Sequence, residues 1–241
     1  MPEEHFKISN FKILKSLIGN GYWGLIFREF FRRLYSDGYF LLLYREISLP
    51  SSIPEPGIHV TLRPMKQDDI PRLLDIDRKG MKEGDVLERL RLLWILNSGL
   101  RECYVAETDE GVPCHISWWI ISTQNPIIEE FYGGGILPLA SNEVLVEGAF
   151  TLEGYQRLGI QKWRRLKFFE KSLSVGVTRV INYVRHDNLP SLESGRSTGY
   201  KLFMIRKDKW RFFRRSFIFN KVPDGTPYPL ENGKITDILS S

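Results

Sequence analysis

Apolar and polar positions along the chain predict short strands interleaved with helices. Several runs have the two-residue period or the continuous apolar character of β-strands and are rich in β-branched and aromatic residues. The predicted strands are residues 58–63, 102–107, 113–121, 143–151, 179–184, 200–206 and 210–219. Amphipathic helices are predicted at residues 86–96, 160–173 and 190–197, and another begins near Asp68 or Asp69. This alternation indicates an α/β domain, assigned to residues 58–220.

The first 47 residues follow a different pattern and are predicted to form a basic-aromatic helical extension. Large apolar residues recur at helical spacing within residues 27–34, and three arginines share that stretch on the opposite face. The apolar run 39–44 could be a strand. Residues 48–57 contain three prolines and are predicted to be a linker, while residues 221–241 form a C-terminal tail. The extension has two interpretations: it packs on the main domain, or residues 11–35 contact a membrane surface or a partner.

Composition narrows the class of protein. The chain has 241 residues, 42% of them hydrophobic, which suits one domain plus an extension. Its net charge of +5 suits a ligand that carries phosphates. RNA binding is a weaker interpretation, because the basic-aromatic run 207–215 also fits a terminal strand with one solvated face. No apolar stretch reaches the roughly twenty residues of a membrane span, and the N-terminus lacks signal-peptide features, so a cytoplasmic protein is expected.

The cysteines and histidines predict neither a metal site nor a disulfide framework. Cys103 and Cys114 lie in apolar strand-like runs and are expected to be buried thiols in a reducing compartment. A disulfide between them is the less favoured alternative. No Cys/His cluster has the spacing of a zinc site.

One segment has the pattern of a phosphate-binding turn. The apolar strand 143–151 ends near Leu152, and a short turn containing Gly159 leads into the amphipathic helix 160–173. The N–H groups at a helix N-terminus, together with the helix dipole, favour an anion such as a pyrophosphate. Spacing alone is weak evidence, because Gly159 could simply permit close packing of helix and strand.

This segment and a second one together resemble the GNAT superfamily of acetyl-CoA-dependent N-acetyltransferases. The family signature, Gln/Arg-x-x-Gly-x-Gly/Ala between its fourth strand and third helix, is similar to residues 156–161, Gln-Arg-Leu-Gly-Ile-Gln. A later family pattern, Asn-x-x-Ser followed by a helix and Gly-Phe, resembles Asn188, Ser191 and the pair Gly199-Tyr200. The resemblance implies a mixed, mainly antiparallel, twisted sheet flanked by helices. It also implies that splayed fourth and fifth strands admit the thioester between them.

The resemblance implies acetyl-CoA as the co-substrate and a set of residues that contact it. These residues are Phe150, Thr151, Leu152, Gln156, Arg157, Leu158, Gly159, Ile160, Gln161, Asn188 and Ser191. Asn188 also suits the N-cap of helix 190–197, and the two roles can hold together. Two positions depart from the family: Gln161 replaces a Gly or Ala, and Gly195 stands where a tyrosine is often assigned as the general acid.

Acyl transfer to a primary amine needs a base, because such an amine is mostly protonated at pH 7. Glu147 is the predicted base or acceptor contact, since it follows apolar residues and would be partly desolvated. Its strand also resembles one in the aminoglycoside N-acetyltransferases, where an acidic residue contacts the acceptor amine. The alternative is a structural carboxylate paired to an arginine. Tyr183 and His186 are the weaker candidates for the acid.

The leading hypothesis is therefore an acetyl-CoA-dependent N-acetyltransferase. Likeness to GNAT proteins that act around bacterial surface glycans implies an amino sugar as acceptor, with loops 80–100 and 122–142 lining its pocket. The alternatives are a non-catalytic acyl-CoA-binding or interaction module on a GNAT-like fold and a basic protein that binds RNA or a membrane surface. A homodimer and a position at the inner face of the membrane belong to the same set of expectations.

Overall fold

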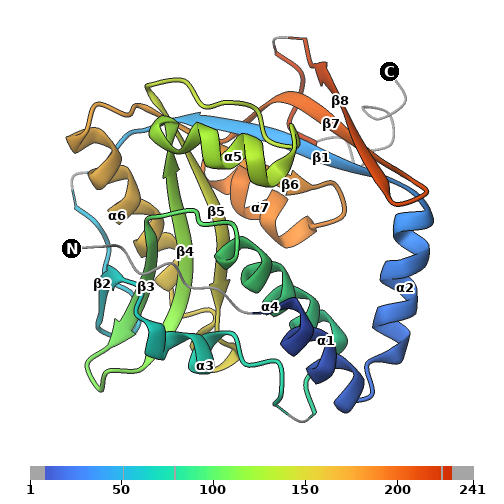
Figure 1. Cartoon of the computed structure of the whole chain (residues 1–241). Coiled ribbons are helices and arrows are strands. Elements are labelled where there is room, and N and C mark those ends of the chain that lie inside the picture. The colour runs from blue at the N-terminus through green and yellow to red at the C-terminus, as the bar shows by residue number, and fades with distance from the viewer. Residues whose placement is uncertain (1–8, 51, 79, 224, 230–241) are drawn as a thin grey trace.

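An eight-stranded sheet organises the computed structural model, which describes residues 9–50, 52–78, 80–223 and 225–229 (Figure 1). The strands lie in the order β2-β3-β4-β5-β6-β1-β7-β8. Their bounds are β1 Tyr35–Glu46, β2 Val60–Pro64, β3 Cys103–Thr108, β4 Pro113–Ile121, β5 Glu143–Thr151, β6 Arg179–Arg185, β7 Lys201–Arg211 and β8 Arg214–Lys221. β5 and β6 pair in parallel and the other neighbours pair antiparallel. The expected mixed, mainly antiparallel sheet is confirmed.

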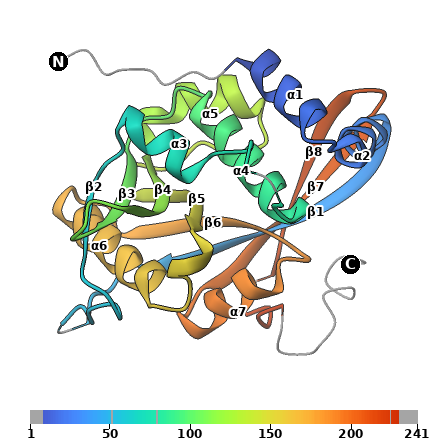
Figure 2. The same cartoon turned by 90° about the horizontal axis from the view of Figure 1, so that it is seen from below.

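Helices cover both faces of the sheet (Figure 2). Their bounds are α1 Asn10–Gly19, α2 Trp23–Leu34, α3 Ile70–Leu73, α4 Glu83–Leu96, α5 Asn125–Tyr132, α6 Ile160–Ser174 and α7 Leu189–Ser197. Helices α6 and α7 share one apolar core with β1 and β6, which includes Phe168, Leu192 and Leu41. Helices α3, α4 and α5 pack on the opposite face around Trp118 and Leu92. No helix in the described ranges is long and apolar enough to cross a membrane.

Strand β1 corrects the predicted domain boundary at residue 47. It lies between β6 and β7 and pairs with both, through Phe40–Glu46 on one side and Tyr35–Tyr44 on the other. Its residues Leu41, Leu42 and Leu43 are at most 1% exposed. A continuous apolar run of this kind suits a strand that is covered on both faces. The main sheet therefore includes residues 35–46, and only the α1 and α2 region remains as a helical extension.

The proline-rich linker runs from the end of β1 to the start of β2 along the α6 side of the sheet. At its beginning, the Ile47 N–H donates to the carbonyl of Thr178 at 2.7 Å. At its end, the Gly57 N–H donates to the carbonyl of Leu158 at 2.7 Å, inside the predicted phosphate-binding turn. The linker is therefore attached to that turn as well as joining two strands.

The C-terminal hairpin and tail also differ from the expected bounds. β7 continues through residues 207–211, and the chain reverses at Phe212 and Phe213. Asp208 is buried and the other four residues of 207–211 are partly buried, so this stretch of β7 does not have the solvated face that the sequence suggested. In the predicted tail, Tyr228 is buried in the core shared by α6 and α7.

Candidate functional site

The parallel strands β5 and β6 part in the middle of the sheet. Their ladder joins Glu143–Leu145 to Arg179–Ile181 and stops there, although β5 continues to Thr151 and β6 to Arg185. On its outer side each strand stays paired, β5 with β4 and β6 with β1. Beyond the last pair, the facing edges carry backbone N–H and C=O groups that have no ladder partner. Such edges can bind a ligand that has amide groups of its own.

A glycine bulge in β5 marks this opening. The register against β4 shifts between Ile116 and Trp118, opposite Gly148, whose φ is +65°. A Cβ atom on residue 148 would lie 2.5 Å from Cε3 of Trp118, so glycine is required for both conformation and space. Bulges bend a strand and re-aim its side chains. Here the bulge places Glu147 on the face covered by α4.

The predicted phosphate-binding turn lies at the end of β5. Arg157 and Gly159 have φ values of +66° and +81°, and the Gln156 side-chain amide donates to the Thr151 carbonyl at 3.2 Å. The Trp163 N–H donates to the Gly159 carbonyl at 3.0 Å in the first turn of α6. The N–H groups of residues 159–162 therefore have no partner within the helix, and Gly159 has no side chain to cap them. Geometry and dipole together suit an anion.

The linker borders this turn. A Cβ atom on Gly159 would lie 3.7 Å from Cα of Pro56, at ordinary contact distance. Beyond it, a hollow of 640 Å³ lies between the linker and helices α6 and α7. Its basic lining residues are Arg45, Lys162 and Arg165. Positive charge thus continues from the turn along the outer side of α6.

A buried hydrogen-bonded chain fixes the last residue of β5. Arg164 Nε donates to His115 Nε2 at 3.3 Å, which assigns the ring proton to Nδ1, and Nδ1 donates to Thr151 Oγ1 at 2.7 Å. Burial, with the charge of Arg164, lowers the pKa of His115 well below its usual value. Burial, followed by the charge of Arg165, lowers the pKa of Arg164 to about 9. The Thr151 hydroxyl is therefore held by a neutral imidazole.

The remaining residues implied to contact acetyl-CoA have local structural roles. Phe150 packs on the α4 face with the guanidinium of Arg89 5.4 Å from its ring centre, and the Leu152 N–H donates to the Cys114 carbonyl. The Ile160 side chain is buried. Asn188 caps α7 by accepting the Ser191 N–H at 3.3 Å, as its sequence context predicted. Ile160 could therefore meet a ligand only through backbone groups, whereas the Phe150 side chain is only partly buried.

Glu147 is paired with an arginine that the sequence analysis did not identify. Its Oε1 accepts from Arg91 Nη1 of α4 and from the Gly148 N–H. Arg91 also forms an ion pair with Glu88 at 2.6 Å. Burial alone would lower the pKa of Arg91, but the charges of Glu147 and Glu88 outweigh it and raise that pKa. The paired-carboxylate alternative is present, and among the described residues Oε2 of Glu147 accepts no hydrogen bond.

Two tyrosines lie on the same side of the sheet as Glu147. The Tyr183 hydroxyl accepts the Leu137 N–H at 3.0 Å, so its own proton stays available to a ligand, and burial raises its pKa. The Tyr132 hydroxyl is buried with no hydrogen-bond partner among the described residues. Burial and then the negative charge of Glu147 raise the pKa of Tyr132. Tyr132 ends α5 just before the glycine-rich loop 133–135, the one signal that could have pointed to it.

The structure does not bring His186 to this group. Its Nδ1 lies 3.3 Å from the carbonyl oxygen of Tyr39, and its ring packs edge-on against the Tyr39 ring at 5.9 Å. Tyr39 packs against the core on the α6 face, whereas Glu147 contacts α4 on the other. Of the two predicted acids, Tyr183 lies on the side of Glu147 and His186 does not.

Tyr228, a residue of the predicted tail, fills the space beside Gly195. A Cβ atom on Gly195 would lie 2.5 Å from the Tyr228 hydroxyl oxygen. That hydroxyl donates to the Leu192 carbonyl at 2.8 Å, and burial raises the pKa of Tyr228 to about 12. Gly195 is therefore explained by packing, because any side chain would displace Tyr228.

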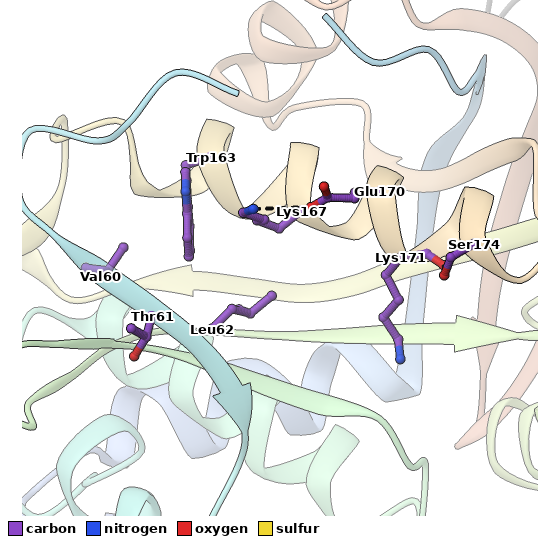
Figure 3. Close-up of a pocket in the computed structure, with 8 residues that line it drawn as sticks. All are labelled: Val60, Thr61, Leu62, Trp163, Lys167, Glu170, Lys171 and Ser174. Atoms are coloured by element: carbon purple, nitrogen blue, oxygen red, sulfur yellow. Dashed lines mark hydrogen bonds and ion pairs between the residues drawn. The ribbon is translucent and has the colours of Figure 1, made fainter. Parts of the chain in front are cut away.

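Other features of the described residues lie apart from this group. A shallow groove of 560 Å³ separates β2 from α6 and is lined by Trp163 and by Lys167, which pairs with Glu170 at 3.2 Å (Figure 3). Cys103 and Cys114 are free thiols, and burial raises the pKa of Cys114 to about 11. Within the described ranges, no three His, Cys, Asp or Glu side chains gather as a metal site would require.

Comparisons with known proteins find solved structures that are similar to this one. No protein-family model matches the sequence, and no curated protein matches it. One similar solved structure is an acetyltransferase of the GNAT family from Colwellia psychrerythraea, with 8% identity, a TM-score of 0.44, and coverage of 83% of this chain and 62% of that one. Another is a GCN5-related N-acetyltransferase from Sphaerobacter thermophilus, with 12% identity, a TM-score of 0.43, and coverage of 77% and 56%.

A third similar structure belongs to a fungal multi-domain protein. It is a GCN5-related glucosamine N-acetyltransferase region of a GH3 β-N-acetylglucosaminidase, with 12% identity, a TM-score of 0.49, and coverage of 76% of this chain and 22% of that one. The chain spans less than two thirds of the length of each of these three structures.

Proposed function

We propose that this protein transfers an acyl group from acetyl-CoA to an amine. The observation that carries the proposal is that β5 and β6 part shortly before the uncapped N-terminus of α6. Glu147 lies at the bulge of β5, after the point where the two strands part. One ligand that has both a pyrophosphate and an amide-bearing arm suits these two features. When bound, acetyl-CoA supplies the activated acyl thioester.

The residues of the turn and the two strand edges have separate tasks in this proposal. The N–H groups of residues 159–162 bind the phosphates, while Gly159 keeps the turn in its left-handed conformation. The open edges of β5 and β6 orient the amide-bearing arm by strand-like hydrogen bonds. Thr151 is held by His115, so the end of β5 is rigid where it meets the turn.

In this proposal, Glu147 binds and deprotonates the acceptor amine. Arg91 and the Gly148 N–H fix Oε1, and Oε2 is left to accept a hydrogen bond from an ammonium group. Removal of that proton gives the amine the lone pair that attack on a thioester requires. Tyr183 offers a hydroxyl proton on the same face of the sheet. Within this proposal, amino sugars are the first acceptors to test.

Binding and turnover should be measured separately. Calorimetry with CoA and acetyl-CoA tests the turn, and release of free thiol in the presence of simple amines and amino sugars tests transfer. The Lys167→Ala variant is a suitable control, because Lys167 lines the separate groove beside β2. The proposal predicts binding and amine-dependent thiol release in both wild type and control. Absence of CoA binding would contradict it.

One observation favours a second candidate, a module that binds acyl-CoA without turnover. Gly195 stands where the related enzymes often have a tyrosine, and the Tyr228 hydroxyl that fills the space is bonded to the Leu192 carbonyl. Tight CoA binding with no thiol release across the whole panel of amines would support this candidate over the enzyme.

A further inference from the structure

One face of α2 is apolar and about half exposed to solvent. Trp23, Phe27, Phe30 and Phe31 follow the spacing of a single helical stripe, and they are 50%, 57%, 49% and 60% exposed. Leu25 is the residue of α2 that is buried. Scattered exposed apolar residues are normal, but a contiguous aromatic stripe marks a surface that binds something.

The tip of the β7–β8 hairpin extends this stripe. Phe212 and Phe213 are 75% and 49% exposed, and the rings of Phe30 and Phe213 lie 5.1 Å apart. The N–H groups of the two tip residues donate to the carbonyls of Leu34 and Arg33 at 2.8 and 2.9 Å, which caps the end of α2. Figure 1 shows α2 beside this turn. We call Trp23, Phe27, Phe30, Phe31, Phe212 and Phe213 the aromatic face.

The backbone of the tip indicates that its phenylalanines serve something other than folding. Phe212 and Phe213 have φ values of +48° and +64°. Bulky residues rarely adopt this left-handed conformation, and two-residue turns of this kind are usually made by Asn-Gly. Phe212 is nevertheless 75% exposed and Phe213 49% exposed, so the Phe212 side chain in particular gains little from packing. Strain that supports an exposed feature points to a role in recognition.

Positive charge borders the aromatic face. Residues 10–34 contain five lysines and arginines and one acidic residue, Glu29, and Arg214 and Arg215 follow the tip. Arg28, Arg32 and Arg215 form ion pairs with carboxylates. Arg33 and Arg214 have no carboxylate within ion-pair distance among the described residues. The face is therefore apolar at its centre and cationic at its rim.

We propose that the aromatic face docks on the surface of an anionic lipid membrane. Phenylalanine and tryptophan side chains on one side of a helix, with arginines around them, suit partial insertion at the headgroup level. Anionic headgroups would pair with Arg33 and Arg214. A second copy of the chain is disfavoured as the occupant, because a symmetric contact would bring the same cationic rims together.

The first test is co-sedimentation with vesicles of phosphatidylglycerol and phosphatidylcholine, compared with pure phosphatidylcholine. Wild type should bind the anionic vesicles and lose binding as salt is raised. The Phe27→Ser/Phe31→Ser variant should bind about tenfold more weakly or worse, since each lost ring removes a large buried apolar area. The control is Val175→Ser, because Val175 is exposed at the end of α6, outside the aromatic face.

A second variant separates docking from folding. Phe212→Asn/Phe213→Gly installs the preferred turn residues, so its melting temperature should equal or exceed that of wild type while vesicle binding falls. Wild-type binding by this variant together with Phe27→Ser/Phe31→Ser would overturn the proposal, as would failure of wild type to bind anionic vesicles. Light scattering gives a further check: a dimer that Phe27→Ser/Phe31→Ser splits, with no vesicle binding, would assign the face to self-association instead.

Discussion

At the scale of single residues, the carboxylate of Glu147 is fixed through one oxygen, and the other accepts no hydrogen bond from the described residues. Oε1 is engaged by Arg91 and by the Gly148 N–H. The arginine holds the carboxylate in place, and the oxygen that accepts no hydrogen bond gives an ammonium group a place to bind. Arg91 is then a positioning residue, because it would act on the acceptor through Glu147.

The Glu147→Gln variant should separate acceptor chemistry from cofactor binding. It keeps the shape of the side chain and removes the proton acceptor, so amine-dependent turnover should fall about a hundredfold or more. CoA affinity, measured by calorimetry, should stay near that of wild type. Glu153→Gln is the matched control, because Glu153 is exposed just beyond β5. Full activity of Glu147→Gln at neutral pH would remove Glu147 from the mechanism.

Gly195 and Tyr228 should behave as a coupled pair in folding. Gly195→Ala places a methyl group 2.5 Å from the Tyr228 hydroxyl oxygen and should cost about 1–3 kcal/mol of unfolding free energy. Tyr228→Phe removes that oxygen and its bond to Leu192, at about 1 kcal/mol. Urea denaturation of the double variant should show a smaller cost than the sum. Additive costs would mean that the hydroxyl and the methyl group do not compete for space.

At the scale of elements, the turn from β5 into α6 joins a strained backbone to an uncapped helix start. Two residues of the turn have positive φ, and the linker contacts it from outside at Pro56 and Gly57. The chain contains a second glycine of the same conformation, Gly176, at the other end of α6, with φ +81° and no atom within 4 Å of an added Cβ. This pair allows cofactor binding to be distinguished from backbone strain.

Gly159→Ala and Gly176→Ala should therefore differ in ligand binding and not in stability. Each forces an L-residue into a left-handed conformation, which costs about 1–2 kcal/mol. Melting temperatures should fall by similar amounts. CoA affinity should fall in Gly159→Ala alone, because only that methyl group borders the proposed phosphate site. Equal CoA affinities in the two folded variants would place the phosphates elsewhere.

The buried chain from Arg164 through His115 to Thr151 should make stability depend on pH. Burial lowers the folded-state pKa of His115, so the unfolded state binds a proton that the folded state does not. The contribution of His115 to the free energy of unfolding is then constant above the ordinary histidine pKa of about 6.5, and stability is lost as pH falls below that value. In His115→Gln, the midpoint of urea denaturation should depend less on pH between about pH 7 and pH 5 than in wild type. An unchanged slope would show that other groups dominate.

At the scale of the whole molecule, the N-terminal segment is part of the sheet. β1 separates β6 from β7, and its central leucines face the cores on both sides. Deletion of residues 1–47 would remove a central strand, so it cannot serve as a test of whether the extension contributes to CoA binding. Residues 35–46, predicted to belong to the extension, are therefore part of the main domain.

Leu42→Ala tests the place of β1 in the fold. Leu42 is fully buried, so the substitution should cost about 2–5 kcal/mol in a single cooperative urea transition. Leu49→Ala in the linker, where the side chain is 40% exposed, should cost much less. A small effect of Leu42→Ala would mean that β1 can detach from the sheet without unfolding it.

The sequence by itself determined the features that depend on neighbours in the chain. The strand 143–151, the helix 160–173 and the cap at Asn188 were predicted because periodicity and capping act over a few residues. The place of Gly159 in the turn between this strand and this helix was predicted in the same way, and its positive φ came from the structure.

Only the tertiary structure decided which distant segments meet. Four such contacts join residues far apart in the chain. β1 inserts between β6 and β7, Arg91 pairs with Glu147, Tyr228 packs against Gly195, and Phe30 contacts Phe213. An apolar run such as residues 39–44 predicts a strand that is buried on both faces, but many positions in a sheet would bury it equally well. Strand order, and with it the surroundings of Glu147, is fixed only when all the apolar surfaces are buried together.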